Sequence, residues 1–160
     1  MKIIFLDIDG VLNYNNWYVS NEYQKLQWNE DNELDIDPAC AERINNICKA
    51  TGAKIVISSD WRFSWYGTQL RLERGGINPD YIYDKTPERI WFAGLTGFDH
   101  SRGAEINDWL EVNECTNYII IDDRTDFTDE QKVNFIHVNP HIGFTDEQME
   151  QAIIMLSKGN

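Results

Sequence analysis

Polar side chains able to bind metal or phosphate follow three short apolar stretches of this sequence, at the point where each stretch ends. They are Asp7 and Asp9, Ser58 and Ser59, and Asp122 and Asp123. Carboxylates that converge on one site repel each other, and a divalent cation relieves that repulsion. A site made only of oxygen ligands suits Mg²⁺, which keeps several waters and accepts phosphate oxygens. The residue types therefore predict a magnesium site that can bind a phosphorylated substrate.

The first acidic pair has a spacing that fits a single pocket. Side chains two residues apart on a strand point to the same side, so Asp7 and Asp9 are expected to face one ligand. Gly10 follows them and lets the backbone turn sharply and approach that ligand closely. Acidic residues at the end of so apolar a stretch point to a functional role.

The elements that must position these residues alternate between strands and helices. Apolar, β-branched stretches predict strands at residues 2–8, 54–58, 81–83, 117–121 and 135–138. Capping residues and apolar periodicity predict helices at 38–51, near 64–74, after Ser101 and after Thr145. This alternation predicts an α/β, Rossmann-like fold, a parallel sheet with helices on both faces. In such sheets ligands bind at the carboxyl ends of the strands, where the polar residues above stand.

Length predicts one domain over residues 1–160, since domains commonly have roughly 100–200 residues. Residues 13–37 are polar and aromatic, and residues 63–99 are irregular in part. Both stretches are expected to form small cap or loop insertions, the first as a long loop or a lid over the site.

Composition limits the classes of partner. The chain has 14 Lys and Arg against 27 Asp and Glu, a formal net charge of −13. This balance disfavours non-specific nucleic-acid binding, which needs basic patches, but it is compatible with recognition of a single phosphate. No apolar run approaches the length of a membrane span, so no membrane is expected as a partner. Three cysteines without CxxC spacing indicate free thiols and a cytoplasmic location.

Four segments together resemble the haloacid dehalogenase (HAD) superfamily. Asp7-Ile8-Asp9-Gly10-Val11-Leu12 matches its DxDG[TV] signature, and the strand Ile55-Val56-Ile57-Ser58 matches its second motif. Arg102 matches the basic residue at a helix start, and Ile119-Ile120-Ile121-Asp122-Asp123 matches the strand that ends in paired acids. The resemblance spans nearly the whole chain. It implies an HAD-like phosphatase fold with a minimal cap.

Shorter strings resemble one group within that superfamily. Ser58-Ser59-Asp60-Trp61-Arg62 and the segment from Arg102 to Leu110 look like the small phosphatase domain of RNA repair proteins. Asp122-Asp123-Arg124-Thr125 is similar to a string in polynucleotide kinase-phosphatases, which remove a 3′-phosphate from nucleic-acid ends. The narrower resemblance implies a nucleotide or a nucleic-acid terminal phosphate as substrate.

The superfamily resemblance also implies a role for each residue. Asp7 would be the nucleophile that forms an aspartyl-phosphate, and Asp9 would be the general acid and then the general base. Ser58 would hydrogen-bond the phosphoryl oxygens, and Arg102 would neutralise their charge. The implied Mg²⁺ ligands are Asp7, Asp9 (through its backbone carbonyl), Asp122 and Asp123. The implied activity is that of a phosphoric monoester hydrolase, a phosphatase.

Several alternatives stay open at the level of sequence. Ser59 can replace Ser58 as the phosphate-binding hydroxyl, and Lys85 is a rival to Arg102. The substrate can instead be a small phosphorylated metabolite. A non-turnover, phospho-accepting module of the receiver type also uses acids, Mg²⁺ and a basic residue, although its phosphoacceptor would sit where this chain has Ser58. A binding protein that keeps only the fold is the last alternative.

Overall fold

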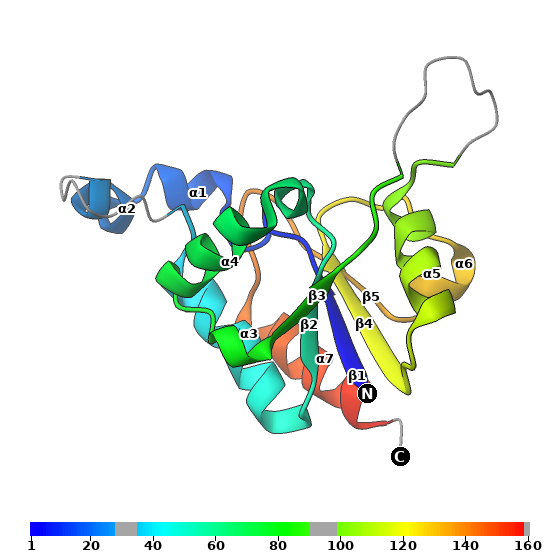
Figure 1. The fold of residues 1–160 in the computed structure, drawn as a ribbon. Helices are drawn as coiled ribbons and strands as arrows, with labels where there is room; N and C mark the ends of the chain where they lie inside the picture. The colour runs from blue at the N-terminus through cyan, green and yellow to red at the C-terminus, as the bar shows by residue number, and fades with distance from the viewer. Residues whose placement is uncertain (28–34, 90–98, 159–160) are drawn as a thin grey trace.

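The sheet has the predicted parallel architecture. The structure, a computed structural model, describes residues 1–27, 35–89 and 99–158. Its strands are β1 (Lys2–Leu6), β2 (Lys54–Ile57), β3 (Ile82–Lys85), β4 (Asn117–Asp122) and β5 (Phe135–His137). They pair only in parallel, in the order β3-β2-β1-β4-β5 (Figure 1). The α/β, Rossmann-like prediction is therefore confirmed.

The central strand β1 is apolar throughout because both faces of the sheet are covered. Ile4 and Leu6 belong to one buried cluster, whereas Ile3 and Phe5 belong to another on the opposite face. This alternation follows from the two-residue period of a strand. Because the strands are parallel neighbours, the carboxyl ends of β1, β2 and β4 lie at the same edge of the sheet.

Helices α3 (Pro38–Thr51), α4 (Trp65–Arg74) and α7 (Asp146–Ser157) pack on the first face (Figure 1). The Asp37 side chain caps α3, and Gly52 ends it in the left-handed conformation, with φ of 73°. Thr145 caps α7 through a reciprocal capping box with Gln148. These ends agree with the helix boundaries that the sequence predicts.

The second face is covered by α5 (Arg102–Val112), beside the short helix α6 (Asp129–Lys132) (Figure 1). Trp109 of α5 packs edge-on against Phe5, with ring centroids 5.4 Å apart. The Ser101 hydroxyl oxygen accepts from the Ala104 backbone N–H at 3.2 Å, which fixes the start of α5. That start matters because it carries Arg102.

The two stretches expected as insertions differ in structure. Residues 13–37 contain the short helices α1 (Asn15–Tyr18) and α2 (Asn21–Gln27), which are too short to show helical periodicity in sequence. In 63–99, α4 and β3 belong to the main layers, joined by the 3-10 helix η2 (Pro79–Tyr81). That part of the second stretch is therefore not a separate cap. Residues 28–34 and 90–98 of these stretches lie outside the described residues.

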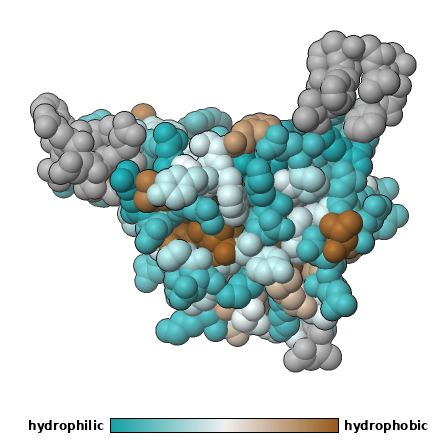
Figure 2. Space-filling model, in the orientation of Figure 1, coloured by the Kyte–Doolittle hydropathy of each residue, from teal (hydrophilic) through white to brown (hydrophobic). Residues whose placement is uncertain are grey.

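The surface agrees with the acidic composition. On the face drawn in Figure 2 hydrophilic residues predominate, and hydrophobic residues appear as separate patches. Among the helices that the structure describes, none combines the length and the apolar character needed to cross a membrane.

Candidate active site

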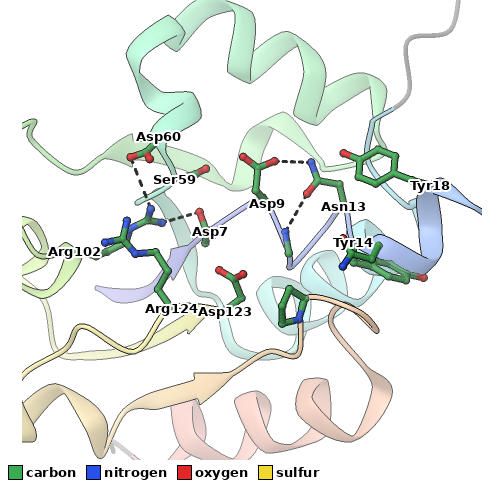
Figure 3. Close-up of a pocket in the computed structure, with 13 residues that line it drawn as sticks. Asp7, Asp9, Asn13, Tyr14, Tyr18, Ser59, Asp60, Arg102, Asp123 and Arg124 are labelled. Carbon is green, nitrogen blue, oxygen red and sulfur yellow. Dashed lines mark hydrogen bonds and ion pairs between the residues drawn. The ribbon is translucent and has the colours of Figure 1, made fainter.

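A pocket of about 410 Å³ opens at the carboxyl edge of the sheet. Its walls come from the segments that follow β1, β2 and β4, together with Arg102 from the start of α5 (Figure 3). Most of its lining side chains are charged or polar. The position agrees with the rule that parallel sheets bind ligands at their carboxyl ends.

Asp7 lies on the inner wall of this pocket. Its backbone N–H donates to the Ile121 carbonyl at 3.0 Å, which extends the β1–β4 ladder by one residue and fixes the side chain. Only 3% of Asp7 is exposed. Its Oδ1 accepts from Arg102 Nη1 at 2.6 Å (Figure 3). Asp7 is thus a buried carboxylate held by a guanidinium.

The Asp7 carboxylate lies close to two other carboxylates. Ligand atoms of Asp7, Asp122 and Asp123 all lie within 4.8 Å of one another. Burial and the charge of Asp7 raise the pKa of Asp122 to about 7, although Arg102 opposes the shift. The same two causes raise the pKa of Asp123. Three crowded oxygen donors are stabilised in their charged form by a divalent cation, so these residues fit Mg²⁺.

Gly10 lets Asp123 approach the loop that follows β1. The φ of Gly10 is +81°, a conformation that side-chain-bearing residues rarely adopt. A Cβ at this position would lie 2.5 Å from Asp123 Oδ2. The glycine after the DxD pair is thus required both by its backbone conformation and by the carboxylate packed against it.

Asp9 lines the same pocket but is held quite differently. Its Oδ1 accepts from Asn13 Nδ2 at 2.8 Å, and its Oδ2 accepts from the indole Nε1 of Trp61 at 2.9 Å. The residue is exposed, and its carboxylate is not part of the three-carboxylate group. The ligand atom that the resemblance implies for Asp9 is its backbone carbonyl, so the position of its side chain outside this group agrees with that expectation.

The structure brings Ser59, rather than Ser58, to the pocket wall. Ser58 is fully buried, does not line the pocket, and its hydroxyl has no hydrogen-bond partner within the described residues. Ser59 Oγ accepts from the Trp61 backbone N–H at 3.4 Å, which leaves its own proton available for a ligand. Of the two candidate serines, the one that lines the pocket is therefore Ser59, the alternative candidate. A shift of one residue at a strand end reverses the side to which a side chain points.

The structure also separates Arg102 from Lys85. Arg102 is 4% exposed, and its Nη1 contacts Asp122 Oδ2 at 3.1 Å as well as Asp7. Lys85 Nζ instead donates to the Arg62 carbonyl at 3.0 Å and pairs with Glu88 at 3.4 Å, away from the pocket lining. Of the two candidate cations, only Arg102 lies against the carboxylates.

A buried ion pair behind the pocket has no counterpart among the sequence predictions. Arg62, in the 3-10 helix η1 (Asp60–Ser64), is 1% exposed, and its Nη2 donates to Glu105 Oε1 at 2.5 Å. Its Nη1 also donates to the Ser58 carbonyl at 2.9 Å. This pair joins the segment that carries Ser59 to the helix that carries Arg102. Its only sequence signal is a polar residue on the apolar stripe of α5.

The loop after β4 provides a second support for Arg102. Asp126 Oδ2 accepts from the Arg102 backbone N–H at 2.9 Å, and it also pairs with Arg124 Nη2 at 2.9 Å. An acidic group at a helix N-terminus is favourable because the first N–H groups lack partners inside the helix. Asp126 therefore fixes the start of α5 relative to the acidic pair that ends β4.

Comparisons with known proteins give one positive result. Neither the curated proteins nor the solved structures include a significant match. A family model described as the HAD domain in Swiss Army Knife RNA repair proteins matches residues 3–149, which include all the pocket residues named above. With this match over most of its length, and with the DxDG segment, the parallel sheet and the carboxylate cluster in agreement, the chain belongs to that family.

Proposed function

We propose that this protein is a Mg²⁺-dependent phosphatase that hydrolyses phosphoric monoesters through an aspartyl-phosphate on Asp7, with residues 1–160 acting as one catalytic domain. The observation that carries the proposal is the inner wall of the pocket. There the Asp7 carboxylate lies beside Asp122 and Asp123, with Arg102 Nη1 2.6 Å from its Oδ1. A nucleophile, a cation-binding group and a fixed positive charge are what phosphoryl transfer requires.

In the first half-reaction Asp7 attacks phosphorus. One carboxylate oxygen of Asp7 forms the new O–P bond, and the bond from phosphorus to the ester oxygen breaks. Asp9 gives its proton to that departing oxygen, so the leaving group departs as an alcohol. Arg102 and the Ser59 hydroxyl bind the phosphoryl oxygens, on which negative charge is spread in the transition state.

In the second half-reaction water hydrolyses the aspartyl-phosphate. Asp9, now a carboxylate, accepts a proton from the water as the water oxygen attacks phosphorus. The O–P bond to Asp7 breaks, which regenerates the carboxylate and releases inorganic phosphate. The sum is one phosphomonoester and one water converted to one alcohol and one phosphate.

Asp7, Asp122 and Asp123 would hold the metal, together with the Asp9 backbone carbonyl. When bound, Mg²⁺ supplies positive charge that offsets the carboxylates and the incoming phosphate dianion. The support for this assignment is the chemistry of the donors, which are oxygen ligands crowded within 4.8 Å. Burial alone makes three negative charges at this distance costly.

For the substrate we infer a nucleotide or a nucleic-acid terminal phosphate. The family description names RNA repair proteins, and Arg124, which follows the acidic pair, adds a cation to the pocket lining. The free thiols Cys40 and Cys48 are buried, in keeping with a cytoplasmic protein. The acidic net charge favours recognition of one terminal phosphate over extended contacts with a polyanion.

The test is phosphate release from a panel of substrates in Mg²⁺, with Asp7→Asn as the blank. The panel contains an aryl phosphate, mononucleotides, a sugar phosphate, and oligonucleotides with 3′- or 5′-phosphates. Release that needs Mg²⁺ and is lost in Asp7→Asn supports the phosphatase. If the wild-type protein instead becomes stably phosphorylated without releasing phosphate, the proposed function is wrong and a phospho-accepting module is the better description.

A further inference from the structure

A second cavity, of about 340 Å³, lies beside the catalytic pocket, and Asp60 lines both. It runs over η1 and the first turns of α4. Besides Asp60 its lining consists of Trp61, Phe63, Ser64, Gly67, Thr68 and Arg71. We refer to these residues as the η1–α4 groove. The mechanism proposed above assigns no role to the groove.

The position of Asp9 places the η1–α4 groove on the leaving-group side of the pocket. The general acid must reach the oxygen that departs, so the rest of the leaving group extends past Asp9. Asp9 Oδ2 accepts from Trp61 Nε1 at 2.9 Å, and Trp61 is itself part of the groove. A leaving group larger than a few atoms would therefore enter the groove.

The walls of the groove have the chemistry of a site for a flat aromatic ring. Phe63 leaves 62% of its surface exposed, and the Arg62 guanidinium carbon lies 5.1 Å from its ring centroid. The Arg71 guanidinium carbon lies 5.2 Å from the Trp61 ring centroid. Half of the Arg71 side chain is exposed, and its Nη1 pairs with Asp35 Oδ2 at 3.6 Å. Exposed aromatic rings combined with guanidinium groups are the usual surface on which nucleic-acid bases stack.

The groove is also held in shape before any ligand binds. The Thr68 hydroxyl donates to the Trp61 carbonyl at 2.5 Å, which ties η1 to α4. The buried Arg62–Glu105 pair ties the same segment to α5. A rigid wall loses little conformational entropy when it receives a ligand.

We propose that the η1–α4 groove binds the base of the nucleotide whose terminal phosphate is removed. The base stacks on Phe63, within the groove that Arg71 also lines. This inference rests on the proposed function, because the catalytic pocket defines which end of the substrate enters the groove. It makes a nucleotide, rather than a sugar phosphate, the preferred leaving group.

The experiment compares two oligonucleotides that differ only in one base. Both end in a 3′-phosphate; one carries adenine at the last nucleoside, and the other carries a tetrahydrofuran residue without a base. A second pair carries the same difference beside a 5′-phosphate. We expect wild-type kcat/KM to be roughly tenfold higher with the base present in at least one pair, the scale of one stacked base.

Two variants test whether the preference for the base-bearing substrate depends on Phe63. In Phe63→Ala the ratio between the base-bearing and the abasic substrate should fall to about 1. Tyr66→Ala is the matched control, because Tyr66 lies three residues further along the chain, in the first turn of α4, is 81% exposed and does not line the groove. This control should keep the wild-type ratio. Thermal denaturation of each variant verifies folding, which both exposed positions should preserve.

Some results would contradict base binding in the η1–α4 groove and leave the proposed phosphatase activity unaffected. These are a wild-type ratio near 1 in both pairs, or a ratio that Tyr18→Ala rather than Phe63→Ala removes. The second result would assign the base to the α1 side, where Tyr18 lines the main pocket. A sugar phosphate hydrolysed faster than any oligonucleotide would contradict both the groove and the inferred substrate, and would leave only the phosphatase activity.

Binding separates failure of the groove from failure of catalysis. The Asp7→Asn protein is titrated calorimetrically with the same oligonucleotides in Mg²⁺, so turnover plays no part. Tighter binding of the base-bearing member, lost in Asp7→Asn/Phe63→Ala, supports the groove even if no phosphate is released by the wild type. Equal binding of both members contradicts the groove, whatever the turnover assay shows.

Discussion

Asp7 and Asp9 are two residues apart in sequence, yet they occupy opposite kinds of environment in one pocket. Asp7 is on the inner wall, 3% exposed, beside two more carboxylates and in contact with Arg102. Asp9 is on the outer rim, exposed, and held by two neutral donors, the Asn13 amide and the Trp61 indole. The inner wall is fixed by charge, whereas the rim is fixed by ordinary hydrogen bonds.

This difference indicates how one short segment can supply two carboxylates for different tasks. A buried carboxylate that a guanidinium holds in one orientation suits the proposed nucleophile. An exposed carboxylate at the rim is accessible to a leaving group and to water, which suits the proposed general acid and base. The predictions below test whether the inner wall and the rim divide the work in this way.

The largest effect is expected from Asp7→Asn on the inner wall. The amide cannot form an aspartyl-phosphate, so turnover should fall by at least about 10⁴-fold, to the background of the assay. The melting temperature should stay the same or rise, because the change removes one of three crowded negative charges. Steady-state kinetics and thermal denaturation on the same preparation measure both. Retained turnover in pure protein would disprove the nucleophile assignment.

Arg102→Ala should have the next largest effect, with a loss in kcat of about 10²–10³-fold, the scale for one group that stabilises transition-state charge. Without Mg²⁺ it should also lower the free energy of unfolding by about 3–5 kcal/mol, because Asp7 and Asp122 lose their buried counter-charge. Lys85→Ala is the matched control. Its partially exposed pair with Glu88 should contribute under about 1 kcal/mol.

The ranking of these two variants is the decisive result. If Lys85→Ala reduces kcat more than Arg102→Ala does, the neutralising charge comes from the end of β3. The inner wall would then be an electrostatic support rather than part of the reacting site. Equal losses would contradict the division between the two cations that the geometry indicates.

On the rim, Asp9→Asn should lower kcat by about 10²–10⁴-fold for a nucleoside monophosphate, whose leaving alcohol needs a proton. The loss should be smaller for the first step with an aryl phosphate, because a phenolate departs without one. Phosphorylated protein should then accumulate, since Asp9 is also the base of the second step. Rapid-quench measurement of protein-bound phosphate tests this. The same loss in both steps with both substrates would be evidence against an acid–base role.

The carboxylates of the inner wall should also make the stability of the protein depend on pH. Burial and Asp7 raise the pKa of Asp122 to about 7, above the usual value near 3.9 in an unfolded chain. The folded protein therefore holds this proton more tightly, so stability falls as pH rises through that interval. In EDTA the melting temperature should drop by roughly 5 °C between pH 5 and pH 7.5. Mg²⁺ should cancel the drop, and Asp122→Asn should flatten it in EDTA.

Much of this architecture is predictable from sequence because it depends on local pattern. The strands β1, β2 and β4 are buried on both faces, so each is a continuous apolar run that ends where polar residues begin. The boundaries of α3 and α7 follow from capping residues. The alternation of strands and helices in turn predicts a parallel sheet, and therefore predicts that the acidic residues after its strands lie together at one edge.

What the sequence does not predict depends on contacts between distant segments. The choice of Ser59 over Ser58 depends on where β2 ends, at Ile57, and a one-residue difference there reverses the side chain. The Arg62–Glu105 pair joins positions 43 residues apart. Helices α1 and α2 are too short to carry a periodic signal. Pairing and packing, rather than local propensity, decide all three.

The smallest effect is expected from Trp61→Phe, which keeps an aromatic ring on the rim and removes one hydrogen bond to Asp9. Asn13 continues to hold the other carboxylate oxygen, so kcat should fall only about fivefold, the scale of one partly exposed hydrogen bond. The loss should be larger for a nucleoside monophosphate than for an aryl phosphate, because the hydrogen bond orients the carboxyl group that is proposed to protonate the leaving oxygen. A merely structural role would lower the activity toward both substrates by the same factor. Equal losses would therefore assign Trp61 to packing, and the orientation of Asp9 would depend on Asn13 alone.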